Sequence, residues 1–391
     1  AKANKSDAAK RAAKKKGPKH GHTPHPRRKP KQIDFEVKLA PKNCPHCEGD
    51  LPEPHKWHSH IQVELPAFLK PFVTRFKIGW CYCRKCKKEV STKQRVLNSK
   101  YGARLHALVV YWKFNLGLTL GKIQKSLNDQ YGLELSTGQI SELIARSGRE
   151  FNDYYDAIGT SLRDQSFLHA DESGWRVDGN NAWLWSYSNP DLTYYDINQS
   201  RGSRVVEEIL GQSYGGVLVS DFYAAYNAID SKKQKCWTHL LRELRELKEK
   251  FPKSSEIQYF SSRLKAFFAR GNQLKIDFDQ GQVIDRRLKR LESETQNWAF
   301  KKHRHAELKR VAKRMVKFRD QLYTFVKSPG VDATNNLAER EQRPAVLLRK
   351  ISYGNRSSDG AKHQAILMSS IRTIEKQGQN FVDTATRHLT Q

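Results

Sequence analysis

Long hydrophobic runs are absent from this sequence of 391 residues. No apolar stretch approaches the ~20 residues of a transmembrane helix, and none has the shorter apolar region of a signal peptide. We therefore expect a soluble, intracellular protein without a membrane partner, long enough for two or three domains. Residue 1 is alanine, so we also expect that it is not the native start.

Cysteine is scarce outside one segment. Five of the six cysteines lie between Cys44 and Cys86, which argues for metal binding rather than disulfides. The segments Cys44-Pro45-His46-Cys47 and Cys83-Arg84-Lys85-Cys86 are two CxxC motifs, and together they supply the four thiolates that one tetrahedral Zn²⁺ prefers. Because Cys44, Cys47, Cys83 and Cys86 would fill all four positions, we expect a structural zinc ion.

Other residues near these motifs leave alternatives open. Cys81 is surplus, and we expect a small buried residue rather than a fifth ligand. A histidine could replace one thiolate, although surface positions are more common for such residues; the candidates are His46, His55, His58 and His60. Between the motifs, Ile61–Leu65 and Val73–Ile78 alternate like strands of a small sheet.

Acidic residues are few relative to basic ones. Lys and Arg total 70 against 41 Asp and Glu, a net charge of +29. Such a charge predicts affinity for a polyanion, and nucleic acid is favoured because phosphate neutralisation releases counterions. An anionic membrane surface is the alternative.

Residues 1–31 concentrate this charge, with twelve Lys or Arg and a single acid, Asp7. They show no apolar periodicity, so we expect a disordered basic tail. An arm along a phosphate backbone and a solvated tail are equally compatible with this composition.

Residues 97–165 have helical patterns. We expect helices over Ala103–Leu116, from Thr119 onward, and after Ser136, which has the side chain of an N-cap. The last two helices flank a glycine-containing turn, as in a helix-turn-helix. Exposed candidates for base contacts on the last helix are Thr137, Gln139, Ser141 and Arg146. An ordinary pair of packed helices explains the pattern equally well.

From residue 166 the pattern changes to alternating strands and helices. Phe167–Asp171 and Gly216–Asp221 are apolar runs that both end in an aspartate. Between them, two further strands, Ala182–Tyr187 and Thr193–Ile197, and a helix, Ser203–Leu210, complete a three-stranded antiparallel meander with a crossover. The order predicts a ribonuclease-H-like α/β fold, in which the first and fourth strands are neighbours. Lys235–His239 is expected to be a fifth strand, followed by a helix over 240–250.

Asp171, Asp221 and a later acid, Glu339, are candidates for a divalent-metal site. Two Mg²⁺ ions ~4 Å apart stabilise the attacking and leaving oxygens of a phosphoryl displacement, and they prefer carboxylate ligands. Two strand ends and a helix would deliver the three carboxylates.

Asn335, Glu339 and Arg343 are spaced for one helical face, so Arg343 is expected to hold a phosphate. Pro344 is expected to limit that helix. Glu172 and Asp178 are rival ligands for which turn or cap roles are favoured.

These motifs together resemble the DDE transposases of the insertion sequence 66 family. The resemblance covers about residues 40–385 and rests on the two CxxC motifs, His169-Ala170-Asp171-Glu172, Ser220-Asp221-Phe222-Tyr223-Ala224-Ala225-Tyr226, Cys236-Trp237-Thr238-His239, Asn335-Asn336-Leu337-Ala338-Glu339-Arg340, Arg343-Pro344 and Arg349-Lys350. Ser173 and Phe222 depart from the family pattern, and neither departure removes a metal ligand.

The resemblance implies that Asp171, Asp221 and Glu339 form a DDE triad with two Mg²⁺ or Mn²⁺ ions. It implies cleavage at terminal inverted repeats, joining of the 3′ ends to target DNA, a homo-oligomer on DNA, accessory proteins, and a cytoplasmic, nucleoid-associated location in a bacterium or archaeon. DNA-binding residues would include His239 near the site, Arg340, Arg343, Arg349 and Lys350.

The expected domains are the basic tail (1–31), a zinc-finger domain (32–96), a helix-turn-helix-like DNA-binding region (97–165), a ribonuclease-H-like catalytic core (166–244 and 331–391, with C-terminal helices) and a helical insertion (245–330). Two alternatives to a transposase remain. One is a metal-dependent nuclease that cuts without joining, and the other is a non-catalytic, sequence-specific DNA-binding protein.

Overall fold

The computed structural model describes residues 32–59, 70–91, 97 and 99–390. The chain divides into two compact units, residues 1–66 and residues 67–391. The expected basic tail, the expected strand Ile61–Leu65 and His60 lie outside the described residues.

A small antiparallel hairpin surrounds the second CxxC motif. It consists of β1 (Trp80–Cys83) and β2 (Lys88–Ser91). The strand expected over Val73–Ile78 is not formed, because this segment has no ladder partner among the described residues and an isolated strand is not stable. Cys81 was expected to be buried but is exposed, since no described element covers this two-stranded ribbon.

Four helices follow: α2 (Ala103–Phe114), α3 (Leu120–Tyr131), α4 (Thr137–Glu150) and α5 (Asn152–Ser161), with a short 3₁₀ turn, η1 (Leu162–Asp164). The predicted cap at Ser136 is confirmed, because its side chain accepts a hydrogen bond from the first turn of α4, and Thr119 caps α3 in the same way. Gly132 ends α3 in a left-handed conformation (φ 63°) that glycine adopts without strain.

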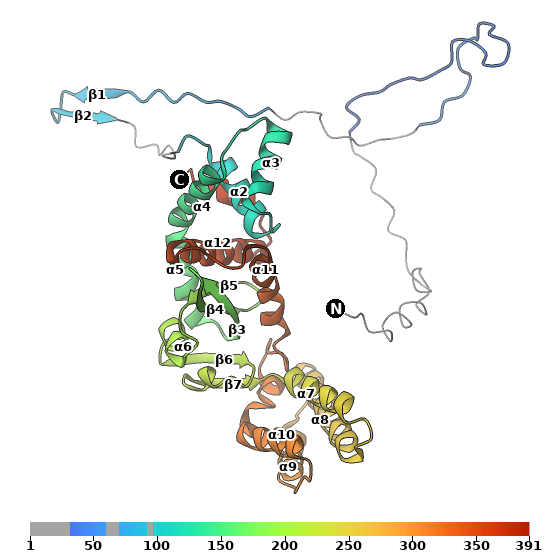
Figure 1. The fold of residues 1–391 in the computed structure, drawn as a ribbon, viewed down its shortest axis with the longest axis vertical. Helices are drawn as coiled ribbons and strands as arrows, with labels where there is room; N and C mark the ends of the chain where they lie inside the picture. Colours follow the sequence, from blue (N-terminus) through green and yellow to red (C-terminus); the bar gives the residue numbers. More distant parts are fainter. Residues whose placement is uncertain (1–31, 60–69, 92–96, 98, 391) are drawn as a thin grey trace. The chain divides into compact units, whose positions relative to one another are not determined.

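The centre of the larger unit is a five-stranded mixed sheet (Figure 1). Its elements are β3 (Phe167–Val177), β4 (Asn180–Ser188), β5 (Thr193–Asn198), α6 (Ser203–Leu210), β6 (Ser213–Ser220), η2 (Ala224–Asn227) and β7 (Asp230–Lys235). The spatial order is β5-β4-β3-β6-β7. β3, β4 and β5 are antiparallel neighbours, whereas β3, β6 and β7 are parallel. The predicted meander, crossover helix and neighbouring fourth strand are therefore confirmed.

Two boundaries differ from the predictions. β3 does not end at Asp171 but continues to Val177, because β4 pairs with it along that whole length. Glu172 is thus a strand residue rather than a turn or cap residue, while Asp178 does occupy the turn (φ 50°). The fifth strand ends at Lys235, since Trp237 begins an amphipathic helix, α7 (Trp237–Lys250), whose apolar spacing includes it.

Side-chain alternation gives the sheet two buried faces. Leu168 and Ala170 of β3 pack with α6 on one face. Trp175 and Val177 pack on the other face with α11 (Asn336–Ser352), α12 (Ser358–Lys376) and α13 (Phe381–His388). Asp171 lies opposite Ser186 in the ladder and therefore points toward this second face.

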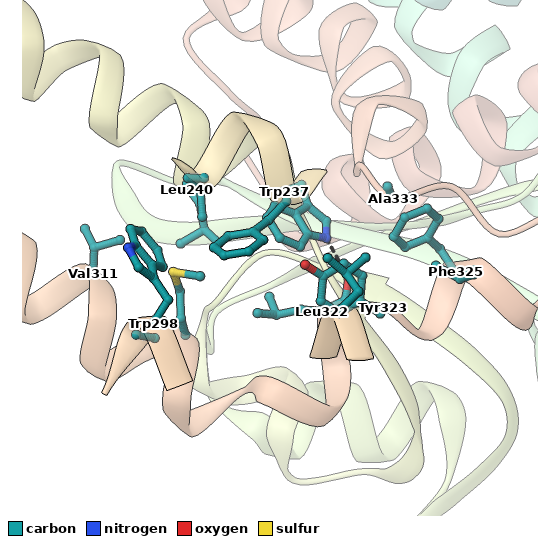
Figure 2. Packing of buried hydrophobic residues seen from close by; sticks show 14 of the residues in the cluster. Trp237, Leu240, Trp298, Val311, Leu322, Tyr323, Phe325 and Ala333 are labelled. Atoms are coloured by element: carbon teal, nitrogen blue, oxygen red, sulfur yellow. Dashed lines mark hydrogen bonds between the residues drawn. The ribbon is translucent and has the colours of Figure 1, made fainter. Parts of the chain in front are cut away.

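Helices α8 (Ser255–Asp279), α9 (Asp285–Ala299) and α10 (Ala306–Lys317), with turns η3 (Arg319–Gln321) and η4 (Thr324–Lys327), form the expected helical stretch. Their core is continuous with the sheet, because Val217 and Val219 of β6 belong to the same apolar cluster. Figure 2 shows Trp237 of α7 at its centre, where the indole Nε1 donates to the Leu322 carbonyl (2.6 Å).

Helix α11 runs through Pro344 to Ser352, so the expectation that proline would limit it is wrong. Ala345 and Leu348, beyond the proline, are buried against the sheet, and this packing offsets the single hydrogen bond that proline cannot donate. Among the described residues, no helix combines the length and the apolar character needed to cross a membrane.

Candidate active site

Strand register brings the two predicted aspartates together. β3 and β6 are parallel, with His169 opposite Val219 as the last paired residues. Asp171 and Asp221 each follow that pair by two residues, Asp171 within β3 and Asp221 directly after β6, and the Asp221 charge helps to raise the pKa of Asp171. Because β6 ends at Ser220 while β3 continues, the pair lies where the parallel ladder opens.

Burial and charge both act on the Asp171 carboxyl group. Desolvation raises its pKa to about 7, and the neighbouring Glu172 and Asp221 carboxylates contribute in the same direction. The Asp171 Oδ1 accepts a hydrogen bond from the Glu172 N–H (3.0 Å). A half-buried carboxyl group beside a second one favours a proton or a cation, so this is an environment that a divalent ion would stabilise.

Asp221 is held by its own turn. Its Oδ1 accepts from the Tyr223 N–H (2.8 Å), and its carbonyl accepts from the Lys235 ammonium (2.9 Å). Lys235 is fully buried and also donates to the Ser220 hydroxyl (3.1 Å), so it fixes the end of β6. In both aspartates Oδ2 has no hydrogen-bond donor among the described residues, and these oxygens are suitable metal donors.

Glu339 lies in the first turn of α11, where its side chain is partly exposed and both carboxylate oxygens lie 3.3 Å from the Arg242 guanidinium of α7. No group of three or more His, Cys, Asp or Glu side chains in the described part of the chain is close enough to hold one metal ion. The structure therefore brings Asp171 and Asp221 together and places Glu339 in an ion pair.

Asn335 joins the segments that carry these acids. It is fully buried. Its Nδ2 donates to the Ala170 carbonyl of β3 (2.8 Å), its Oδ1 lies 3.1 Å from the His169 Nδ1, and its backbone N–H donates to the Cys236 sulfur (3.1 Å). Its carbonyl accepts from the Glu339 N–H (3.1 Å). Asn335 precedes α11 as its N-cap residue instead of lying on the predicted helical face.

Gln342 makes a second connection between α11 and the sheet. Its Nε2 lies 3.1 Å from the Asp171 carbonyl, 3.3 Å from the Leu184 carbonyl and 2.9 Å from the Ser186 hydroxyl. Asn335 and Gln342 therefore attach α11 to β3 on both sides of the Asp171 peptide, which positions Glu339 relative to the sheet edge.

His239 lies in the first turn of α7, close to the acids. A side-chain hydrogen bond with Cys236 is the main reason that the pKa of His239 is raised, and the charges of Asp221 and Glu339 raise it further. Its Nδ1 is buried and has no hydrogen-bond partner among the described residues. This nitrogen is therefore available to form a hydrogen bond with a group that binds at the site.

Glu172, the rival ligand, is engaged elsewhere. Its side chain is only 3% exposed and faces α6, where it pairs with Arg201 (2.8 Å) and accepts from the Tyr226 hydroxyl (2.6 Å). Arg201 in turn lies over the Tyr223 ring, 4.2 Å from its centroid. Glu172 thus supports the loops around the site from the opposite face.

Sequence patterns alone did not indicate three further residues of the site, Arg242, Lys235 and Arg201. Arg242 lies one helical turn after His239, and that i,i+3 spacing was a signal that could have indicated it. Lys235 ends a strand of polar residues, Asp230–Lys235, and no local pattern marks it as buried. Arg201 reaches Glu172 only through the tertiary fold.

The predicted base-contacting residues on α4 are differently placed. Thr137 is exposed at the start of the helix. Gln139 forms a capping box with Ser136 and also donates to the Tyr101 hydroxyl (3.2 Å). Arg146 is only 29% exposed and lies 3.8 Å from Glu142. Ser141 is exposed, so two of the four side chains already have partners within the helical region.

The predicted basic residues on α11 fall into two groups. Arg340, Arg343 and Lys350 are exposed, and no acidic side chain within the described residues forms an ion pair with them. Arg349 instead donates to the Ser173 hydroxyl and to the Gly174 carbonyl of β3.

Each CxxC motif is folded in the same way within its own unit. The Glu48 N–H donates to the Cys44 carbonyl and the Lys87 N–H to the Cys83 carbonyl, both at 2.8 Å. The residue after each second cysteine is left-handed, with φ 59° at Glu48 and 54° at Lys87. Backbone N–H groups that point at the sulfur lower the pKa of Cys44 and Cys83, which favours the thiolates that bind metal. His46, His55 and His58 are exposed, as expected.

The fold and the site define an α/β protein with a mixed sheet and a pair of aspartates at the edge of that sheet. The model of the family described as "Transposase IS66 family" matches residues 98–363. The chain belongs to this family, which suggests an enzyme that acts on DNA. The match includes all three predicted triad residues.

Two curated relatives come from Sinorhizobium fredii (strain NBRC 101917 / NGR234). The "Uncharacterized protein y4qI" is 22% identical over 74% of this chain and 59% of its own length. The "Uncharacterized protein y4hP" is 22% identical over 89% of this chain and 71% of its own length. The chain thus spans less than two thirds of the first relative.

Proposed function

We propose that this protein is a DNA transposase with a ribonuclease-H-like catalytic core. It would cut a phosphodiester bond at each end of a mobile element and join the freed 3′ ends to target DNA. The observation that carries the proposal is the strand register that sets Asp171 beside Asp221 where β6 ends. Family membership and the strand order agree with it.

Asp171, Asp221 and Glu339 would hold two Mg²⁺ or Mn²⁺ ions. The oxygen donors and the burial of Asp171 fit hard divalent cations. When bound, such ions activate the attacking oxygen and stabilise the leaving oxygen. To join this set, the Glu339 carboxylate would exchange the Arg242 guanidinium for a metal.

The chain's own residues orient the site and the DNA. Lys235 and the Tyr223 N–H hold Asp221, while Asn335 and Gln342 hold α11 against β3. Arg340, Arg343 and Lys350, which have no acidic partner among the described residues, would bind phosphates.

We also propose that Cys44, Cys47, Cys83 and Cys86 bind one structural Zn²⁺. The shared geometry of the two CxxC motifs and their lowered thiol pKa values support this. Zinc content measured on the wild type and on Cys44→Ser tests the ligand set, and zinc retained at full occupancy in the variant would contradict it.

The deciding experiment incubates wild type, Asp171→Asn and Asp178→Asn with Mg²⁺ or Mn²⁺ and DNA that carries the element ends. Cleavage and joining by wild type and Asp178→Asn, but not by Asp171→Asn, are expected. Cleavage without joined products would favour the nuclease alternative. Tight binding with no cleavage by wild type would favour a non-catalytic DNA-binding protein. Identical products from wild type and Asp171→Asn would refute the catalytic assignment.

A further inference from the structure

Helix α11 carries an exposed face that begins at the candidate active site. Glu339, Arg343 and Lys350 lie along one side of the helix, and Arg340, Leu347 and Ile351 lie on the adjoining side. Leu347 is 58% exposed and Ile351 43% exposed. We call Arg340, Arg343, Leu347, Lys350, Ile351 and Tyr353 the α11 track. The opposite side of the helix, with Ala345 and Leu348, is buried against the sheet.

Tyr353 stands at the far end of the track. It is 82% exposed, and neither its ring nor its hydroxyl has a partner among the described residues. Its backbone is left-handed (φ 61°, ψ 7°), and its N–H donates to the Arg349 carbonyl (2.7 Å), which closes the last turn of α11.

The helix end does not explain this tyrosine. A left-handed residue at this position favours glycine or asparagine, and a bulky side chain is strained there. Strain of this kind at an exposed aromatic residue indicates a role in binding rather than in folding.

The turn that displays Tyr353 is rigidly held. Asn355 pairs with the β3–β4 hairpin through its N–H to the Arg176 carbonyl (2.9 Å) and its carbonyl to the Asp178 N–H (2.8 Å). Its Oδ1 accepts from the Trp175 indole (2.7 Å). Gly354 (φ 120°) lies between Tyr353 and Asn355 and has no room for a Cβ, which would lie 2.3 Å from the Arg176 carbonyl oxygen. The ring is therefore presented from a fixed backbone.

The surroundings of the ring are basic and apolar. Lys350 and Arg356 flank it in sequence, both exposed and without an acidic partner in the described part of the chain. Ile351 lies beside the α2–α3 loop, where a Cβ on Gly117 would be 3.7 Å from its Cδ1. Basic side chains next to an exposed aromatic ring match a nucleic-acid strand, which offers phosphates and base faces together.

We propose that the α11 track binds the DNA next to the scissile phosphate and that Tyr353 stacks on a base opened from the duplex. The proposal rests on the transposase function proposed above. From Glu339 to Tyr353 the helix rises about 21 Å, at ~1.5 Å per residue. At ~3.4 Å per nucleotide, the stacked base lies about six nucleotides from the cut.

The test uses DNA that wild type cuts, with binding measured in the Asp171→Asn background so that the DNA stays intact. Tyr353→Gly is the informative variant, because glycine suits the left-handed position. We expect it to raise the thermal midpoint while weakening DNA binding about tenfold, the scale of one lost aromatic–base stack. Tyr353→Phe should retain the affinity. Tyr259→Ala, at an exposed tyrosine of α8, is the matched control and should leave affinity unchanged.

A single mismatch moved along the duplex locates the opened base. A mismatch lowers the energy of opening, so binding should be strongest when it lies about six nucleotides from the cut. That gain should disappear in Tyr353→Gly. Unchanged affinity in Tyr353→Gly, or a gain that persists in it, would overturn this inference while leaving the catalytic proposal intact. Failure of wild type to cut any DNA would instead overturn the proposed function.

Discussion

The sheet edge and helix α4 both carry side chains that their sequence patterns associate with function, but the fold uses them differently. Where the β3–β6 ladder opens, Asp171 and Asp221 lie close enough for the Asp221 charge to raise the pKa of Asp171, and each keeps one carboxylate oxygen without a donor among the described residues. On α4, Gln139 serves the helix cap and Arg146 lies near Glu142. Strand register therefore indicates a site more strongly than exposed helix positions, because caps and i,i+4 pairs use the same polar residues.

Removing a sheet-edge carboxylate should have the largest effect. Asp221→Asn is expected to lower DNA cleavage by at least about a thousandfold, because the loss of a proposed metal ligand would remove a cation that stabilises the charge on the reacting phosphate, and such stabilisation contributes on that scale. Cleavage rates with Mg²⁺ and circular dichroism are the measurements. Asp178→Asn, in the exposed turn after β3, is the control. If Asp221→Asn cleaved DNA at the wild-type rate, the aspartates at the sheet would have no more functional importance than the polar residues of α4.

Substitution of Asn335, which connects β3, the Cys236 segment and α11 by hydrogen bonds, should have the second largest effect. Asn335→Ala leaves the Ala170 carbonyl and the His169 imidazole without partners, so the free energy of unfolding should fall by about 2–4 kcal/mol. Cleavage should fall as well, because Glu339 follows on the same helix. Urea unfolding and cleavage rates check this. Asn336→Ala, at the exposed neighbour, should change neither quantity much, and equal losses in both variants would argue against a specific joint.

Removing the N-cap of α4 tests whether the polar residues of this helix stabilise the fold or contact DNA. Ser136→Ala should lower the free energy of unfolding by about 1 kcal/mol, since the side chain of Ser136 satisfies a backbone N–H of the first turn. Thr137→Ala, one residue further, should cost little. If Ser136→Ala instead weakened DNA binding and left the free energy of unfolding unchanged, the main role of α4 would be to contact DNA and not to pack against the other helices.

The smallest effect should come from His106, which anchors α4 to α2. Its Nδ1 lies 3.2 Å from the Leu143 carbonyl, and its Nε2 lies 2.9 Å from the Ser99 hydroxyl. Burial lowers the pKa of His106 below its ordinary value of about 6.5. The unfolded chain therefore binds a proton first as the pH falls, so stability is lost below about pH 6.5.

His106→Gln should flatten that dependence, because glutamine has no proton to gain. Urea unfolding at pH 7.5 and pH 5 measures the difference between the two proteins. His58→Gln, at an exposed histidine of the smaller unit, is the control. An unchanged pH dependence in His106→Gln would show that other groups govern acid stability.

Much of the central sheet was predictable from local patterns. The alternation of apolar strands and turn residues between 167 and 221 identified β3, β4, β5, α6 and β6, and the strand order followed from the crossover rule. The failures have physical causes. β3 passes Asp171 because of its β4 partner, and α11 passes Pro344 because of its packing on the sheet.

The partners at the site were less predictable. Lys235 is polar in sequence and fully buried in the fold, and Arg242 reaches Glu339 from a separate helix. Asn335 was placed on a helical face but acts as a joint between β3, the Cys236 segment and α11. Such contacts join residues far apart in the chain, and no short-range pattern encodes them.

The amino-acid sequence by itself determined the positive charge, the two CxxC motifs, the strand periodicity and the positions of the three acids, because these depend on residue type and spacing. Only the tertiary structure decided the register between β3 and β6, that Glu339 pairs with Arg242, and that Tyr353 is displayed on a rigid turn. Those outcomes depend on strand register, helix packing and burial, which arise only when distant segments of the chain meet.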